Sequence, residues 1–408
     1  DYAEAHNNLG NAKKEMGQAK EAVHHYQRAV SISPHYAEAR NNLGSAFADL
    51  GNLEEARQLF QQTLELVPRH PRALENLGSV LLRQGKADEA LEILQRAVEQ
   101  NPLSAQAKIS LGQCLDSLVP LWHTPMMNDH PRNEAFQAAL KALVTPDTRV
   151  LEIGTGSGLL AMMAAECGAK HVTTCEMSPL IAGTARKIIA KNGLSDGIRV
   201  IARESTQIEI GEDLPFSADV IVSEILSSEF LGEGVLSSIE DARRRLLSPG
   251  GKLVPGKGRI MVALVGGDDL GQRVFVESVC GFDLGLFNKI TSRRRFVPAW
   301  AKMDLLSEGV TAFEFDFQTT DYFPPEHKQI KIPVQSEGIC YGLVQWNFME
   351  MAQGIFFENH PSLQAAASGW SHPVYLFEAP VRVRPGQTAV FKASHDRVTP
   401  WFSLGELG

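Results

Sequence analysis

Three glycines and one glutamate form the stretch best suited to hold a nucleotide-like cofactor. Gly154, Gly156 and Gly158 lie between an apolar strand-like segment and an apolar helical one. Glycine permits a tight turn there and lets a ligand approach the start of the following helix. Glu176 follows at the tip of the next expected strand, where a carboxylate can accept hydrogen bonds from a ribose diol. The G-x-G-x-G spacing lacks the third glycine position of the dinucleotide fingerprint and favours S-adenosylmethionine over NAD. The alternative is an ordinary strand-to-helix turn.

Two further glutamates are spaced to bind a cation. Glu224 ends an apolar strand-like run, and Glu233 follows nine residues later between two glycines. Converging carboxylates repel each other unless a cation lies between them, and planar guanidinium can make parallel N–H···O bonds to both. The pair would fix the third guanidinium nitrogen for in-line attack on a sulfonium methyl, by positioning and electrostatics. The alternative is that Glu233 is a surface charge.

One arginine lies close enough in sequence to reach the glycine loop. Arg132 precedes an amphipathic helix that we expect from about Asn133, within a lid segment at 119–146. A guanidinium at this place could hold the cofactor's carboxylate with a two-pronged bond. The alternative is an arginine exposed to solvent near a helix start.

The elements that must position these residues alternate between strands and helices. Strand patterns at 149–153, 171–175, 198–202 and 218–223 are separated by helical patterns ending near 168, at 179–192 and near 235–247. Parallel strands with crossover helices form a doubly wound α/β fold. We therefore expect a Rossmann-like domain with its lid at 119–254, and ligands at the carboxyl ends of its strands.

The remainder, 255–408, changes to short strand patterns. They fall at 259–265, 311–317, 338–348, 374–377, 387–392 and 401–404. This spacing predicts a β-barrel or a sandwich. The run Arg293-Arg294-Arg295 suggests either RNA contact or a solvated loop, and we favour the loop.

Residues 1–118 repeat with a period of 34 residues. The pattern is typical of tetratricopeptide repeats, all-α helix pairs that stack into a superhelix with a peptide-binding concave face, here with a final helix near 103–118. The recurring landmarks are Pro34, Pro68 and Pro102; Leu9-Gly10, Leu43-Gly44, Leu77-Gly78 and Leu111-Gly112; Gly17, Gly51 and Gly85; and Ala22, Ala56 and Ala90.

Asparagine recurs with the same period, at Asn8, Asn42 and Asn76. Side-chain amides there could grip the backbone of an extended peptide substrate. The favoured alternative is that asparagine is common at this position and merely supports the turn between repeats.

The charge, the hydrophobic content and the cysteines of the chain argue against several classes of protein. The chain has 408 residues, 44% of them hydrophobic, and a net charge of -9, which argues against direct nucleic-acid binding and suits a cationic protein substrate. No apolar run is long enough for a membrane span, and no signal peptide is evident. The cysteines form no C-x-x-C pair and predict free thiols rather than a metal site, so we expect a cytoplasmic or nuclear protein. They are Cys114, Cys167, Cys175, Cys280 and Cys340.

The combined motifs resemble the protein arginine N-methyltransferases. The resemblance covers roughly 119–408 and rests on VLEIGTGSGLL, CEMSP, SEILSSEFLGEG and PGGKLVPG. WHTPMMNDHPRN and RESTQIEIGED are similar to the seven/nine branch of the family, and repeats before the catalytic module resemble its nine-like members. The resemblance implies S-adenosylmethionine as cofactor and arginine-containing proteins as substrates, RNA-binding proteins among them. It implies monomethyl and symmetric dimethyl arginine as products.

The resemblance implies a role for each of the candidate site residues. Arg132 would bind the methionine carboxylate, Glu152 its amino end and Glu176 the ribose. Glu224 and Glu233 would clamp the substrate arginine, and Trp370 would stack on its guanidinium unless it is a core residue of the barrel. The remaining cofactor contacts would be Gly154, Gly156, Ser205, Thr206, Met126 and His123.

The sequence departs from the family at two places. The tyrosine-rich segment of the asymmetric-dimethylating members is missing before His123, and Trp122 is the candidate replacement in the lid. Ser368-Gly369-Trp370 stands where the family has threonine-histidine-tryptophan, and nine-like members also lack this histidine. The departures leave the product type open.

Members of the resembling family have an arm inserted after the first barrel strand, and we expect it here at about 268–302. This arm predicts that the chain assembles with a partner module. Its apolar residues predict an interface, either in a homodimer or with a second module in tandem.

Two rival functions remain: a class I methyltransferase acting on a different nucleophile, and a repeat scaffold with a degenerate methyltransferase domain. The glutamate pair argues against the first, and the intact glycine loop argues against the second.

Overall fold

Helices alone make up the N-terminal part of the computed structural model, which describes residues 2–363 and 368–408. Each helix packs against the next, and the recurring glycines allow the close approach. A Cβ on Gly78 would lie only 2.3 Å from the Leu94 side chain. The helices are α1 (Ala3–Glu15), α2 (Ala19–Ile32), α3 (Ala37–Asp49), α4 (Leu53–Leu66), α5 (Pro71–Arg83), α6 (Ala87–Gln100) and α7 (Ala105–Leu118).

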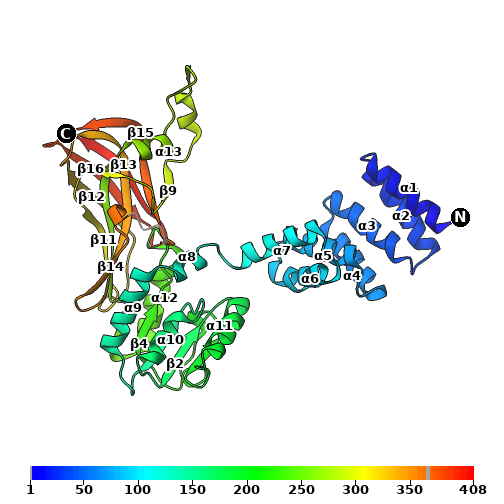
Figure 1. The fold of residues 1–408 in the computed structure, drawn as a ribbon, viewed down its shortest axis with the longest axis horizontal. Coiled ribbons are helices and arrows are strands. Elements are labelled where there is room, and N and C mark those ends of the chain that lie inside the picture. Colours follow the sequence, from blue (N-terminus) through cyan, green and yellow to red (C-terminus); the bar gives the residue numbers. More distant parts are fainter. Residues whose placement is uncertain (1, 364–367) are drawn as a thin grey trace. The chain divides into compact units, whose positions relative to one another are not determined.

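The chain divides into two compact units, Asp1–Leu121 and Trp122–Gly408. Figure 1 shows helices α1 to α7 in the first unit, and two kinds of sheet in the second. The predicted array ends at Leu118 with α7, and the unit boundary falls after Leu121. The predicted boundary at 254/255 does not divide the second unit further. One apolar core is shared across that boundary, from Leu151 in the first sheet to Phe391 in the last.

The second unit begins with a parallel sheet in the order β3-β2-β1-β4-β5. Its strands are β1 (Arg149–Ile153), β2 (His171–Cys175), β3 (Ile198–Ile201), β4 (Ala218–Ser223) and β5 (Leu247–Val254). The associated helices are α8 (His123–Met127), α9 (His130–Leu143), α10 (Leu159–Glu166), α11 (Pro179–Lys191) and α12 (Val235–Arg245). The doubly wound prediction is confirmed, and the strand order β3-β2-β1-β4 puts the glycine loop at the centre of the sheet.

Two antiparallel sheets follow and share one core, as predicted for a barrel-like half. One has the order β10-β6-β13-β15-β9, with β11 beside β6 and β14 beside β13, and the other has the order β12-β16-β17. The strands are β6 (Lys257–Gly266), β9 (Arg294–Pro298), β10 (Asp304–Leu305), β11 (Val310–Asp316), β12 (Glu326–Pro333), β13 (Gly338–Ala352), β14 (Ile355–Glu358), β15 (Ser371–Val383), β16 (Thr388–His395) and β17 (Pro400–Leu407).

The arm is shorter than predicted. Helix α13 (Asp268–Val274) packs into the barrel core through buried Leu270, and β9 pairs with β15. Only 275–293, with β7 (Ser278–Val279) and β8 (Phe282–Asp283), projects from the barrel in Figure 1. The loop interpretation of Arg293-Arg294-Arg295 is wrong for Arg294 and Arg295, because both lie in β9 and complete the sheet.

Within the described residues, no helix combines the length and the apolar character that crossing a membrane requires.

Candidate active site

The glycine loop holds the carboxylate of Glu176 at the end of β2. The backbone N–H of Gly156 donates to Glu176 Oε2 at 3.1 Å, and that of Ser178 donates to Oε1 at 3.0 Å. Gly154 donates to the carbonyl of Cys175 at 3.0 Å, so the loop is tied to the tip of the strand. Gly156 and Gly154 both have positive φ, which glycine adopts without strain. Glu176 is thereby fixed beside the loop, with lone pairs left for a diol.

Glu152 lies inside the same sheet and is almost inaccessible. Its side chain accepts a hydrogen bond from the Thr174 hydroxyl at 2.6 Å, and only 1% of the residue is exposed. Burial raises the pKa of Glu152 to about 8, although the Thr174 bond opposes the shift. A buried carboxylate of this kind is stabilised by an ammonium group. The environment therefore fits the amino end of S-adenosylmethionine.

The other predicted cofactor residues surround this edge of the sheet. Ser205 is buried and Thr206 exposed in a turn after β3, and Arg245 Nη2 donates to their carbonyls at 3.3 and 3.1 Å. His123 and Met126 lie partly buried on α8. Burial lowers the pKa of His123, and the negative charge of Glu176 opposes this shift.

Arg132 is not exposed at a helix start, contrary to the alternative considered above. Its side chain is 4% exposed, and Nη1 donates to Glu224 Oε2 at 2.9 Å. Nε and Nη2 both donate to Asn133 Oδ1, at 3.2 and 2.8 Å. A guanidinium has five N–H groups, so two remain for another partner such as the methionine carboxylate. Arg132 therefore links the predicted cofactor site to the predicted clamp.

Asp129 is a site residue that sequence reasoning missed. It caps α9, which begins at His130 rather than near Asn133, by accepting from the Arg132 N–H at 3.3 Å. Its second oxygen accepts from the Ser368 hydroxyl at 2.9 Å. The Asn-Asp-His-Pro run is a recognisable helix start, with aspartate at the cap and proline in the first turn. That signal was available in the sequence.

Glu233 lies in a strained turn. Its φ of 60° and that of Phe230, 73°, are both in the left-handed region, which non-glycine residues rarely adopt. Such strain concentrates at functional sites when the surroundings impose it. Although the residue reaches the surface, partial burial of its carboxyl raises the pKa of Glu233, and repulsion from Glu176 adds to the shift.

Glu224 carries the clearest sign of a missing partner. Its Oε1 is buried and has no hydrogen-bond partner in the part of the chain that the structure describes. Burial raises the pKa of Glu224 to about 8, Arg132 opposes the shift, and Glu233 and Asp129 add to it. Leaving a buried acceptor unsatisfied is costly, so a donor is expected there. A second guanidinium between Glu224 and Glu233 would supply both the donor and the charge.

Trp370 lies in the shared apolar core of the second unit. It is 4% exposed, and its backbone N–H donates to the Ser368 hydroxyl at 3.2 Å. Stacking on a guanidinium thus stays a prediction. At the neighbouring position, a Cβ on Gly369 would lie 2.9 Å from the backbone nitrogen of Met126. Helix α8 therefore occupies the space that a histidine at 369 would need.

The predicted substrate asparagines of the array have different surroundings. Asn42 Nδ2 donates to Asn7 Oδ1 at 3.0 Å and to Asn11 Oδ1 at 3.2 Å, and Asn76 Nδ2 donates to Asn41 Oδ1 at 3.1 Å. These bonds join the side chains of successive repeats, which favours a structural role over substrate binding for both, although the bonds link helices rather than the turn between repeats. Asn8 is exposed. Its role in binding a substrate stays a prediction.

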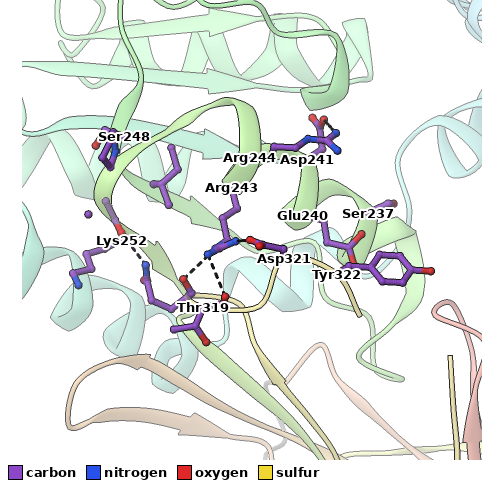
Figure 2. A pocket seen from close by; sticks show the side chains of 15 residues that line it. Ser237, Glu240, Asp241, Arg243, Arg244, Ser248, Lys252, Thr319, Asp321 and Tyr322 are labelled. Carbon is purple, nitrogen blue, oxygen red and sulfur yellow. Dashed lines mark hydrogen bonds and ion pairs between the residues drawn. The ribbon is translucent and has the colours of Figure 1, made fainter. Parts of the chain in front are cut away.

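A pocket of about 970 Å³ lies elsewhere in the same unit, between α12, β5 and the loop at 318–322 (Figure 2). Arg243 points into it and donates to the carbonyls of Gln318 and Thr319, at 3.1 and 3.2 Å, and pairs with Asp321. Because β5 runs parallel to β4 and starts beside Ala218, the pocket lies at the end of the sheet opposite Glu224. It is therefore separate from the predicted catalytic centre.

Comparisons with known proteins bear on the assignment. Tetratricopeptide repeat models match residues 1–69, 49–105 and 75–119, and a model described as Ribosomal protein L11 methyltransferase matches 129–255. The chain is 37% identical over 277 residues to Arginine N(omega)-methyltransferase of Streptomyces achromogenes subsp. streptozoticus, covering 67% of this chain and 76% of that relative. The chain belongs to the arginine N-methyltransferase family. Its reaction transfers a methyl group from S-adenosylmethionine to arginine.

Other relatives match this chain over only part of their own length. Protein arginine N-methyltransferase 7 of Drosophila erecta is 27% identical over 325 residues, which cover 69% of this chain and 47% of that one. The chain thus spans about half of that relative, and resemblance to the nine-like branch stays a prediction.

Two solved structures share the fold. The Trypanosoma brucei PRMT1 enzyme-prozyme heterotetrameric complex with AdoHcy matches with a TM-score of 0.58, at 22% identity over 69% of this chain and 96% of that chain. Protein arginine methyltransferase 10 of Arabidopsis thaliana matches with a TM-score of 0.55, at 23% identity over 66% of this chain and 86% of that chain.

The raised pKa of Glu224 predicts how this arginine methyltransferase responds to pH. As the pH falls below about 8, a growing share of the Glu224 carboxyl holds a proton, and this neutral form binds the substrate guanidinium, which stays charged throughout, less strongly than the carboxylate does. We expect kcat/KM for the arginine substrate, at saturating S-adenosylmethionine, to rise with pH and level off above that value. Initial rates between about pH 6 and pH 10 test this. A flat profile across the range would show that Glu224 is already ionised in the free enzyme.

Proposed function

We propose that this chain methylates arginine side chains of proteins, giving monomethyl and symmetric dimethyl arginine, and that the repeat array recruits the protein substrates. The observation that carries the proposal is the buried, unpartnered Oε1 of Glu224, whose pKa the charge of Glu233 also raises. Guanidinium is the side chain whose charge and planar donors satisfy both carboxylates. The symmetric product follows only from the resemblance to the seven/nine branch.

The roles of the residues follow from their surroundings. When bound, S-adenosylmethionine supplies an electrophilic methyl on a positively charged sulfur. Glu152 and Glu176 would hold its amino and ribose groups, while Glu224 and Glu233 would orient the guanidinium and leave one nitrogen facing the methyl. The several carboxylates at this edge of the sheet stabilise both cationic partners. No described group of three or more His, Cys, Asp or Glu side chains is arranged to hold a metal ion.

Transfer of labelled methyl tests the proposal. The chain is incubated with labelled S-adenosylmethionine and either an arginine-rich peptide, the same peptide with lysine for arginine, or free arginine. Hydrolysis and amino-acid identification then give the acceptor and the product. We expect label in monomethyl and symmetric dimethyl arginine from the first peptide alone. Label only in free arginine would contradict a protein substrate, a point of interest because the Streptomyces relative's name specifies arginine without protein.

The array should matter more for whole proteins than for short peptides. The unit Trp122–Gly408 has its own core, so removal of 1–118 should leave it folded. A concave repeat surface adds affinity away from the catalytic site by raising the local substrate concentration. We expect kcat/KM to fall at least about tenfold more on a whole-protein substrate than on an arginine peptide. Equal losses on both would identify the array as a folding support.

Assembly as a homodimer is also proposed, because the arm exposes apolar side chains. Several of them are more than half exposed, which is typical of an interface that a partner copy covers. The most exposed are Phe282, Leu286, Phe287 and Ile290. A tandem second module in a longer natural chain would be an alternative partner for the same arm. The expected cytoplasmic or nuclear location stays a prediction.

Light scattering at micromolar concentration tests the dimer. We expect a mass near twice the 44.7 kDa of the chain, and a monomer for the variant Phe282→Glu combined with Leu286→Glu. Phe356 is 53% exposed on β14, outside the arm, so Phe356→Glu is the matched control and should stay dimeric. A monomeric parent chain would contradict the proposal.

A further inference from the structure

The loop between the two clamp glutamates is organised around Ser227. Its carbonyl accepts from the Phe230 N–H at 2.8 Å, and its hydroxyl accepts from the Gly232 N–H at 3.1 Å. Glu224 directly follows β4, but Glu233 depends on this turn for its place. The separation of the two carboxylates is therefore decided by where Ser227 is held.

A barrel residue reaches this point. Asn347 on β13 donates from Nδ2 to the Ser227 carbonyl at 3.0 Å, and the residue is 0% exposed. Asn359 fixes it, because Asn347 N donates to Asn359 Oδ1 at 2.8 Å and Asn359 N donates to the Asn347 carbonyl at 3.3 Å. A buried amide is costly unless it is hydrogen-bonded, and Asn347 Oδ1 has no partner among the described residues, so an apolar residue would be the default on such a strand. The contact with the loop accounts for the asparagine.

The same loop meets the barrel at neighbouring points. The Ser371 N–H donates to the Ser228 hydroxyl at 3.1 Å, and Arg294 pairs with Glu229. Phe230 is fully buried, with its ring stacked on those of Phe315 and Phe317. The strained φ of Phe230 is thus imposed by the barrel, and the hydrogen bond from Asn347 is directed at the turn that precedes it.

We propose that Asn347 is a positioning residue for arginine methylation, which sets the separation of Glu224 and Glu233 through Ser227. The inference rests on the proposed clamp. Asn347 is fully buried and is not among the residues assigned to substrate or cofactor, so it acts through the backbone of the loop. A shift of about 1 Å in a group that orients the reacting nitrogen can cost about 100-fold in rate.

Asn347→Ala removes the donor, and Gln345→Ala is the matched control. Gln345 is equally buried on the same strand, but its amide oxygen accepts from the Tyr375 hydroxyl at 3.0 Å. We expect Asn347→Ala to lower kcat/KM for an arginine peptide by about 10- to 100-fold, with affinity for S-adenosylmethionine changed less than about twofold. Gln345→Ala should lose thermal stability to a similar extent but change kcat/KM by less than about threefold.

Hydrogen exchange of the backbone amides at 227–233 provides a readout independent of activity. In Asn347→Ala these amides should exchange at least about tenfold faster than in the parent, and in Gln345→Ala they should not. Unchanged exchange and activity in Asn347→Ala, or equal losses in both variants, would overturn the positioning role. An inactive parent chain would instead contradict the proposed function, while the exchange comparison still decides the role of Asn347.

Discussion

Glu224→Gln and Glu233→Gln should each lower methyl transfer by about a thousandfold or more while S-adenosylmethionine still binds. Each change keeps the shape of the side chain but removes the charge that holds the guanidinium. Loss of one partner from a desolvated charge pair typically costs about 2–5 kcal/mol, and loss of orientation adds to this. Single-turnover rates give the size of the effect, and calorimetry gives the affinity for the cofactor.

The control for these variants is Glu240→Gln. Glu240 is another partly buried glutamate of the same unit, paired with Arg397 at 2.7 Å, and it lines the separate pocket in Figure 2. We expect its removal to leave the rate within about twofold. If cofactor affinity falls in parallel with the rate in the Glu224 and Glu233 variants, these residues are not the clamp.

Arg132→Ala should have the second largest effect, on both stability and activity. It leaves Glu224 without its cation, and removing one partner from a buried pair typically costs about 3–5 kcal/mol when the remaining group is ionised. Arg132 lowers the pKa of Glu224, so its loss raises that pKa further above the value in the unfolded chain. A carboxyl with a raised folded-state pKa loses stability as pH increases between the unfolded and folded values. The destabilisation should therefore be small near pH 5 and largest near pH 9.

Denaturant unfolding at these two pH values measures the effect, with Arg149→Ala as the control. Arg149 pairs with Asp219 at 2.6 Å at the other end of the same sheet, but both side chains are about one-third exposed. An exposed pair contributes about 1 kcal/mol or less. If Arg132→Ala is no more destabilising than Arg149→Ala at either pH, the ion pair with Glu224 is not a structural element of the site.

Much of this protein could be predicted from local patterns. The repeat landmarks identify the helices up to α7 because each repeat is a short helix pair whose residues recur at one period. The G-x-G-x-G loop and Glu176 identify the cofactor edge, because a turn between strand and helix depends on adjacent residues. The edge strands β9 and β12 were missed, since β9 is only five residues long and β12 begins with four polar residues before its alternation starts.

Contacts between distant segments were decided only by the tertiary structure. The pairing of Arg132 with Glu224 joins residues 92 positions apart, and the contact of Asn347 with Ser227 joins residues 120 apart. Neither follows from spacing, because each depends on how α9 and β13 pack on the loop after β4. The sequence alone thus determined which residue types could bind a sulfonium cofactor and a guanidinium. Only the tertiary structure showed that buried Arg132 pairs with Glu224 and that Asn347 of the barrel contacts the loop before Glu233. The physical reason is that packing alone brings these distant side chains together.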